Sequence, residues 1–468
     1  MQGVVLAMSL GLLCGAAHAA PRQISLAKVR DIIATRERIV SPRGIQQQLY
    51  VPIGGIRQWI SIRGQDLRNP ILLILHGGPG SPEMPAAWTF QPPWEDYFTV
   101  VEWDQRGTGK TYEANTPAQM APGMSVAGMT HDAADLVRYL RKRFHKKKIF
   151  ILGHSWGTVL GVMLAQRHPN WFYAYIGVGQ IVNMRRGEEV GYAWTLRQAQ
   201  EHHNAEAIRE LKAIAPYPGK ILTIRKVSVR SKWEMYYGGL AYGRHNFEWD
   251  SRTWRLSPDY NSSDLRAIRA GSQFSLKYLL QPLLTVNFDH VTRFGCPVIE
   301  FVGAHDYTTP SSLLIQWFKR LHAPSKRLVI FSGSAHMIFE EQPGRFLVHL
   351  VDDALPYAIK AGDAAPPEKE IVCFRQTCVI ERQWCTQIRS GLSSVIGGSM
   401  SRRETRQAEL ASLPGLRRQL DAWRARKRSG EAIPRSLWKG AALLPRRGGL
   451  SRQLYLLTLS GPLYTEIG

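Results

Sequence analysis

Residues 147–161, KKIFILGHSWGTVLG, constrain the fold of this 468-residue chain more than any other stretch. Four apolar residues, 149–152, lead into the pattern G-x-S-x-G centred on Ser155, and an apolar run with small residues follows. This order predicts a strand, a sharp turn and a helix. Glycines suit the positions beside the serine because larger side chains there would collide with the strand and the helix. The stretch therefore predicts a nucleophile elbow.

Further apolar runs recur along the chain on both sides of the elbow. We expect strands at residues 58–63, 70–75, 97–103, 173–179, 297–302 and 327–331, and helices at 24–50, 129–144 and 345–359. Strands that alternate with helices at this spacing indicate a mostly parallel sheet with helices on both faces. The sequence therefore predicts an α/β fold.

The alternation stops between residues 181 and 290. This segment is rich in Trp, Tyr and Arg, has helical character and contains no run typical of a buried strand. We expect it to form a helical cap over the carboxyl ends of the strands. The α/β core then consists of residues 45–180 and 291–360.

The two ends of the chain have a different character from the core. An apolar run at residues 4–15 followed by Ala17-His18-Ala19 predicts a signal peptide over residues 1–19, with a buried N-terminal helix as the alternative. No later stretch reaches the roughly 18 apolar residues of a membrane span. We therefore expect an exported protein, periplasmic or secreted, without a membrane span.

Residues 364–468 follow a linker-like sequence and are strongly basic, especially from 402 to 452. They contribute much of the formal net charge of +23. We expect a poorly ordered, solvated tail. Nucleic-acid binding through phosphate contacts is the alternative, but an exported enzyme would gain little from it, and we do not expect nucleic acid as a partner.

Two polar residues after later strands complete a catalytic arrangement around Ser155. A serine hydroxyl needs a base, and the base needs an acid that orients it. Asp306 directly follows the strand at 297–302, and His336 follows the strand at 327–331. The order Ser, Asp, His along the chain fits a hydrolase triad.

Backbone amides are expected to stabilise the negative charge of the tetrahedral intermediate. One donor is the amide of Trp156, the residue after the proposed nucleophile. The second comes from the glycines that follow the strand at 70–75, where missing side chains let the backbone approach. We favour Gly78 over Gly77 for this donor.

Five motifs together carry a family resemblance: HGGPG at 76–80, DQRGTG at 104–109, GHSWG at 153–157, GAHDYTTP at 303–310 and SAHMIFEEQP at 334–343. Over about residues 45–360 the chain resembles the proline iminopeptidase-like family of α/β hydrolases. The resemblance implies the α/β-hydrolase fold, the triad Ser155, Asp306 and His336, and release of an N-terminal residue, often proline, from small peptides. The basic tail lies outside it.

An aminopeptidase of this kind must bind a free α-ammonium group. A buried carboxylate would bind it through a charge-assisted hydrogen bond. The cap offers Glu188, Glu189 and Glu234 for this role, and we favour Glu188; a solvated helix face is the alternative interpretation.

The leading hypothesis is an exported serine aminopeptidase that needs no cofactor and no metal. An esterase or amidase on the same scaffold is the second hypothesis, with a small peptide or an ester as substrate. A hydrolase-like scaffold used only for binding is a third, which the complete set of triad residues disfavours. The sequence does not indicate the oligomeric state.

Overall fold

The apolar runs of the sequence form the inner strands of an eight-stranded β-sheet. The structure, a computed structural model, describes residues 24–366, 372–374 and 377–379. The strands of the sheet are β1 Ile45–Ile53, β2 Ile56–Gly64, β3 Ile71–Leu75, β4 Thr99–Asp104, β5 Ile149–His154, β6 Phe172–Val178, β7 Val298–Gly303 and β8 Lys326–Phe331. Their order is β1-β2-β4-β3-β5-β6-β7-β8. Neighbours from β4 to β8 are parallel, whereas β1 and β2 run antiparallel to each other and β2 runs antiparallel to β4.

Helices cover both faces of the sheet, which confirms the predicted α/β class. The helices are α1 Leu26–Arg36, α2 Gly109–Glu113, α3 Pro117–Met120, α4 Val126–Arg143, α5 Trp156–Arg167, α6 Met184–Glu201, α7 Ala205–Ala213, α8 Ile224–Tyr236, α9 Glu248–Leu256, α10 Ser262–Leu283, α11 Ser311–Lys319, α12 Ile338–Glu341, α13 Pro343–His349 and α14 Leu355–Lys360. Helices α4, α5 and α11 share one apolar core with one face of the sheet. Helices α12, α13 and α14 share a second core with the other face. The inner strands are buried on both faces because each core covers one of them.

The expectation of a single lead-in helix over residues 24–50 is wrong in its second half. Helix α1 ends at Arg36, and strand β1 begins at Ile45. The glycines Gly54 and Gly55 have φ of +55° and +79° and join β1 to β2 in a tight hairpin. The sequence signal for this hairpin was a pair of glycines between two segments that can form strands. The first segment was not recognised as a strand because β1 lies at the edge of the sheet, is largely exposed and carries polar residues.

The expected helix at residues 345–359 is also interrupted. Helices α13 and α14 are joined by a π-helical turn at Leu350–Ala354. Pro356 lies in the first turn of α14 and has no N–H with which to continue the preceding helix.

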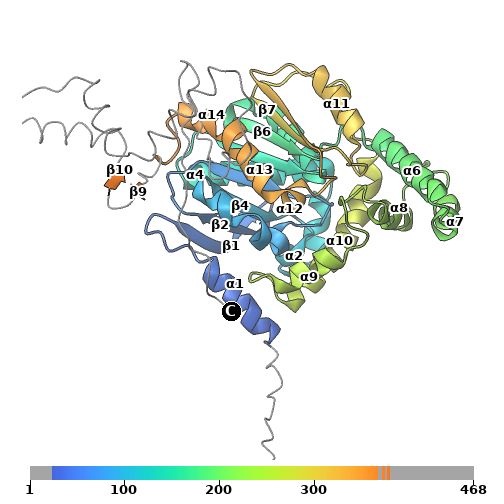
Figure 1. Ribbon diagram of the computed structural model, residues 1–468, viewed down its shortest axis with the longest axis horizontal. Helices are drawn as coiled ribbons and strands as arrows, with labels where there is room; N and C mark the ends of the chain where they lie inside the picture. Colours follow the sequence, from blue (N-terminus) through green and yellow to red (C-terminus); the bar gives the residue numbers. More distant parts are fainter. Residues whose placement is uncertain (1–23, 367–371, 375–376, 380–468) are drawn as a thin grey trace, which may run out of the picture. The chain divides into compact units, whose positions relative to one another are not determined.

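Helices α6 to α10 form a cap between β6 and β7, with an apolar core of its own. In Figure 1 most of these helices, drawn in green and yellow, lie to the right of the strands. Polar contacts tie the cap to the α/β core. Lys110 pairs with Asp264 of α10 at 2.7 Å, and the backbone N–H of His336 donates to the carbonyl of Leu240 at 3.0 Å.

The chain divides into two units, residues 1–366 and residues 367–468. The first contains everything described above. In the second, the strands β9 Val372–Phe374 and β10 Thr377–Val379 form an antiparallel pair. The expected signal peptide at 1–19 and nearly all of the expected basic tail lie outside the described residues. Among the described residues, no helix is both long enough and apolar enough to cross a bilayer.

Candidate active site

The predicted elbow lies between β5 and α5, with Ser155 at its tip. Ser155 has φ +52° and ψ −119°, which is strained for a residue with a side chain. A Cβ at Gly153 would lie 2.6 Å from the carbonyl oxygen of Gly157, and a Cβ at Gly157 would lie 1.7 Å from that of Leu75. Both glycines of G-x-S-x-G are therefore required by close packing at the turn.

Asp306 and His336 meet where β7 and β8 end. Nδ1 of His336 lies 2.8 Å from Oδ2 of Asp306, and both side chains are buried. Thr309 donates to Asp306 from its backbone N–H at 2.9 Å and from its hydroxyl at 2.8 Å. The carboxylate of Asp306 accepts a hydrogen bond from Nδ1–H of His336, so that Nε2 keeps its lone pair and can act as a base.

Gly179, just after β6, gives the imidazole of His336 its space. Its φ is +59°, and a Cβ there would lie 2.6 Å from Cε1 of His336. Sequence reasoning did not single out this glycine. Its position directly after a buried strand was the signal that could have suggested it.

The expected oxyanion donors differ in their hydrogen bonds. The N–H of Gly77 donates to Oε1 of Glu83 at 3.1 Å and is therefore engaged. Within the described part of the chain, the amides of Gly78 and Trp156 have no acceptor. Gly78 has φ +110°, a backbone conformation that glycine adopts readily and other residues rarely adopt.

Glu83 and His154 form a buried ion pair directly beside the elbow. Oε1 of Glu83 lies 2.5 Å from Nδ1 of His154, and Nε2 of His154 lies 3.2 Å from the carbonyl oxygen of His336. Burial opposes both charges, but the mutual contact outweighs it: the pKa of Glu83 is lowered and that of His154 is raised. Glu83 thus connects the Gly77 turn, the elbow and the histidine loop. Sequence reasoning missed both residues, although His154 lies in the GHSWG motif and Glu83 follows the HGGPG motif by three residues.

A cavity of about 920 Å³ contains this site. Ser155, His336 and Gly78 line it on the side of the core, and helices α1, α9 and α10 line it on the other. A volume of this size suits a small organic ligand or a short peptide.

The cap glutamates expected to bind an ammonium group do not line this cavity. Glu188 is buried against Tyr217 and lies 3.4 Å from Arg230, and Glu189 is exposed. Glu234 lies 2.6 Å from Arg230 and accepts a hydrogen bond from Thr308. Burial raises the pKa of Glu234 to about 7, with Arg230 opposing this shift.

Two other carboxylates, Asp250 and Glu340, line the cavity together with Glu83. Within the described residues, the buried Oδ2 of Asp250 has no hydrogen-bond partner. Burial raises the pKa of Asp250, with Arg244 opposing. Burial, reinforced by Asp250, raises the pKa of Glu340 to about 7 although Arg244 lies 3.0 Å away.

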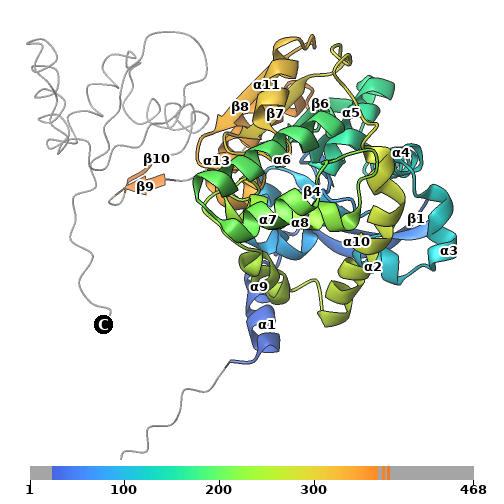
Figure 2. The same ribbon diagram turned by 90° about the vertical axis from the view of Figure 1, so that its right-hand side faces the viewer.

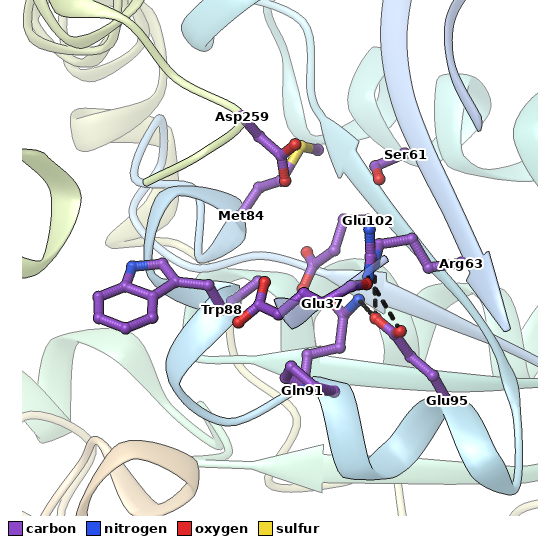
Figure 3. A pocket seen from close by; sticks show the side chains of 11 residues that line it. Glu37, Ser61, Arg63, Met84, Trp88, Gln91, Glu95, Glu102 and Asp259 are labelled. Carbon is purple, nitrogen blue, oxygen red and sulfur yellow. Dashed lines mark hydrogen bonds and ion pairs between the residues drawn. The ribbon is translucent and has the colours of Figure 1, made fainter. Parts of the chain in front are cut away.

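Figure 3 shows a second, much smaller cavity, of about 10 Å³, lined largely by polar groups. Arg63 pairs there with Glu95 at 2.7 Å, next to Glu37, Glu102 and Asp259. Burial raises the pKa of Glu102 well above its usual value. The space holds about one water molecule, so a substrate does not fit. No group of His, Cys, Asp and Glu among the described residues is arranged to hold a metal ion.

Known proteins are similar to this chain in sequence and in fold. The model of a family described as the alpha/beta hydrolase fold matches residues 70–343. A probable aminopeptidase of Bacillus subtilis is 32% identical over 296 residues, which span 63% of this chain and 92% of that protein. A proline iminopeptidase of Neisseria gonorrhoeae is 32% identical over 326 residues, which span 66% of this chain and 96% of that protein.

A solved structure shares the fold. The crystal structure of a proline iminopeptidase from Mycobacterium smegmatis superposes with a TM-score of 0.51 at 18% identity, covering 67% of this chain and all of that one. At this identity, the similarity supports the fold and not a substrate.

Proposed function

Because this chain belongs to the proline iminopeptidase-like family of α/β hydrolases, we propose that it is a serine aminopeptidase that releases the N-terminal residue, often proline, from small peptides. The observation that carries the proposal is the hydrogen bond of 2.8 Å between the buried Asp306 and His336, because His336 lines the same cavity as Ser155. This arrangement supplies a base, an orienting acid and a nucleophile in one site.

The reaction follows from these roles. Oγ of Ser155 attacks the carbonyl carbon of the N-terminal residue, and its proton passes to Nε2 of His336. The oxyanion accepts hydrogen bonds from the amides of Gly78 and Trp156, each worth on the order of 3 kcal/mol in the transition state. Collapse of the intermediate returns the proton to the leaving amine and leaves an acyl-enzyme. Water then attacks, with His336 taking its proton, and the free amino acid leaves.

The α-ammonium group needs a carboxylate inside the cavity. Asp250 and Glu340 support this role better than Glu188 or Glu234, because only the first two line the cavity. Glu340 is already paired with Arg244, so Asp250 is the better candidate of the two. A bound ammonium group would favour the ionised form of both carboxyl groups. Asp250 is the less engaged of the two, because its buried Oδ2 has no hydrogen-bond partner among the described residues.

An esterase or amidase activity is the second candidate. The apolar side chains of Phe247, Trp254 and Ile268 line the same cavity and suit an acyl group without an amine. Hydrolysis rates for alanine and proline naphthylamides, for N-acetylalanine naphthylamide and for a simple aryl ester separate the two functions. The proposal predicts that free-amine substrates react at least tenfold faster than the N-acetylated one, and a preference for the blocked substrate would exclude aminopeptidase action.

Export is part of the proposal and rests on residues 1–19 of the sequence. Cleavage after Ala19 would leave a mature chain beginning at Ala20. N-terminal sequencing of the protein recovered outside the cytoplasm tests it, and an intact Met1 in that fraction would contradict it.

A further inference from the structure

Four arginine side chains line the active-site cavity on the side away from the core: Arg30 of α1, Arg255 of α9, and Arg266 and Arg269 of α10. We call these four residues the arginine rim. None of the four forms an ion pair with a carboxylate anywhere in the described part of the chain. Arg30 is partly buried and the other three are exposed, whereas the buried arginines Arg106 and Arg230 are both paired.

One nitrogen of the Arg30 guanidinium group has no hydrogen-bond acceptor among the described residues. Its Nε donates to the carbonyl oxygen of Arg255 at 2.9 Å. Its Nη2 is buried and has no hydrogen-bond partner among the described residues. Buried donors are normally paired, so Arg30, which lines the cavity, has a donor that the described residues leave unused.

The helices that carry the rim come together from distant parts of the sequence. Helices α1 and α9 lie side by side in both Figure 1 and Figure 2. Arg266 and Arg269 are one turn apart on α10 and therefore lie on the same side of that helix. The cavity lining thus carries groups of both charges. Asp250 and Glu340 are acidic, and Glu340 follows His336 closely in the chain. The rim is basic.

We propose that the arginine rim binds the C-terminal carboxylate of a short peptide whose N-terminal residue occupies the catalytic site. This assignment rests on the proposed aminopeptidase function. A guanidinium group matches the planar, two-oxygen geometry of a carboxylate. A short peptide carries an ammonium group at one end and a carboxylate at the other, as the charges of the cavity require. The enzyme is therefore a peptidase of short peptides with a free C-terminus.

The test compares three probes: tri-alanine, tri-alanine amide, and Ala-Ala-Asp amide, whose only carboxylate is in a side chain. Their dissociation constants are measured by calorimetry on the full chain carrying Ser155→Ala, so that no turnover occurs. The proposal predicts that tri-alanine binds about tenfold more tightly than its amide, as a charge-assisted contact of this kind supplies. It also predicts that tri-alanine binds more tightly than Ala-Ala-Asp amide.

Substitutions then assign the effect to the rim. Two variants are made in the Ser155→Ala background: Arg30→Gln alone, and Arg266→Gln combined with Arg269→Gln. Each is expected to reduce the tenfold ratio between the dissociation constants of tri-alanine amide and tri-alanine to about twofold or less. Arg197→Gln is the matched control, because Arg197 is an exposed cap arginine that does not line the cavity. It should leave the ratio unchanged.

The outcomes separate the two proposals. Equal affinities for tri-alanine and its amide, tighter binding of Ala-Ala-Asp amide, or no measurable binding of any probe would overturn the rim assignment. A ratio that falls equally in the Arg197 control would overturn it too. Release of free alanine from tri-alanine by the wild-type chain is measured separately. If the wild-type chain releases no alanine but tri-alanine still binds about tenfold more tightly than its amide, the aminopeptidase function is rejected and the rim remains a carboxylate site.

Discussion

At the scale of single residues, the active site depends on positions where a side chain is missing. Gly153 and Gly157 allow the elbow, and Gly179 leaves room for His336. The elbow glycines were predictable because they belong to a local pattern around Ser155. Gly179 was not, because it is far from His336 in sequence and only the fold brings the two together.

The same limit applies to charged residues. Asp306 and His336 could be located from the sequence because the carboxyl ends of parallel strands lie at one edge of the sheet. A carboxylate for the proposed ammonium contact could not be located in this way. Glu188 lies in the expected segment, but Arg230, 42 residues further along, pairs with it. Such pairings between helices of the cap leave no periodic signal.

The first prediction concerns Gly179→Ala. A methyl group 2.6 Å from Cε1 of His336 must displace the imidazole, and the positive φ adds strain. We expect kcat/KM to fall about 10- to 100-fold, as small misplacements of catalytic groups do. Gly55→Ala is the matched control, since Gly55 also has positive φ but has nothing within 4 Å of its added Cβ. Similar losses of activity in both variants would contradict the role of Gly179.

At the scale of elements, strand β7 contains a group that weakens the fold. Glu300 is fully buried, and neither carboxylate oxygen has a hydrogen-bond partner among the described residues. Burial raises its pKa well above the usual value. In the folded state the group keeps a proton that the unfolded chain has lost. Its destabilising effect is therefore smallest below about pH 4.5 and grows as the pH rises toward the folded-state pKa.

The second prediction follows for Glu300→Met. Removing the unpaired carboxyl group should stabilise the protein by about 1–3 kcal/mol near neutral pH. The gain in melting temperature over wild type should be larger at pH 8 than at pH 5. Glu300→Gln keeps a polar group but cannot ionise, so its gain over wild type should also be larger at pH 8 than at pH 5, and should be smaller than that of Glu300→Met at both values. A lower melting temperature for Glu300→Met at pH 8 would contradict this account.

The cap is joined to the core through Arg230 of α8. Its guanidinium pairs with Glu188 and Glu234 and donates to the carbonyl oxygen of Tyr307, next to the Asp306 loop, at 2.8 Å. The contact links the two parts of the chain that enclose the cavity.

The third prediction is that Arg230→Met destabilises the protein by about 3–5 kcal/mol, because two buried carboxylates lose their cation. Chemical denaturation measures this loss. Arg225→Met, on the same helix but exposed and without an ion pair among the described residues, should change stability by less than about 0.5 kcal/mol. An equal loss of unfolding free energy in the two variants would show that the destabilisation does not come from loss of the buried ion pairs of Arg230.

At the scale of the whole molecule, the alternation of strand-like and helix-like segments, and its interruption at residues 181–290, predicted an α/β core with an inserted helical segment. The strands were predictable because buried parallel strands are continuous apolar runs. Strand β1 was not, because it lies at the edge of the sheet and has polar residues on its exposed side. The arginine rim also escaped prediction, because it joins residues of α1, α9 and α10 that are up to 239 positions apart.

The fourth prediction concerns the division of the chain at residue 366. The first unit contains every proposed catalytic and binding residue. A chain that ends at Pro366 should keep kcat/KM within about twofold of the full chain and unfold at nearly the same temperature. Failure of this shorter chain to fold would show that residues 367–468 are needed by the enzyme.

The central claim is that Ser155 is the nucleophile of an aminopeptidase. The most direct measurement is the kcat of Ser155→Ala on alanine and proline naphthylamides beside the wild-type chain, with circular dichroism as the check on folding. We predict that wild type releases the free amino acid and that the folded variant is slower by at least about 10⁴-fold, as in other serine hydrolases that lose the nucleophile. A folded variant that keeps activity within tenfold of wild type would contradict the claim.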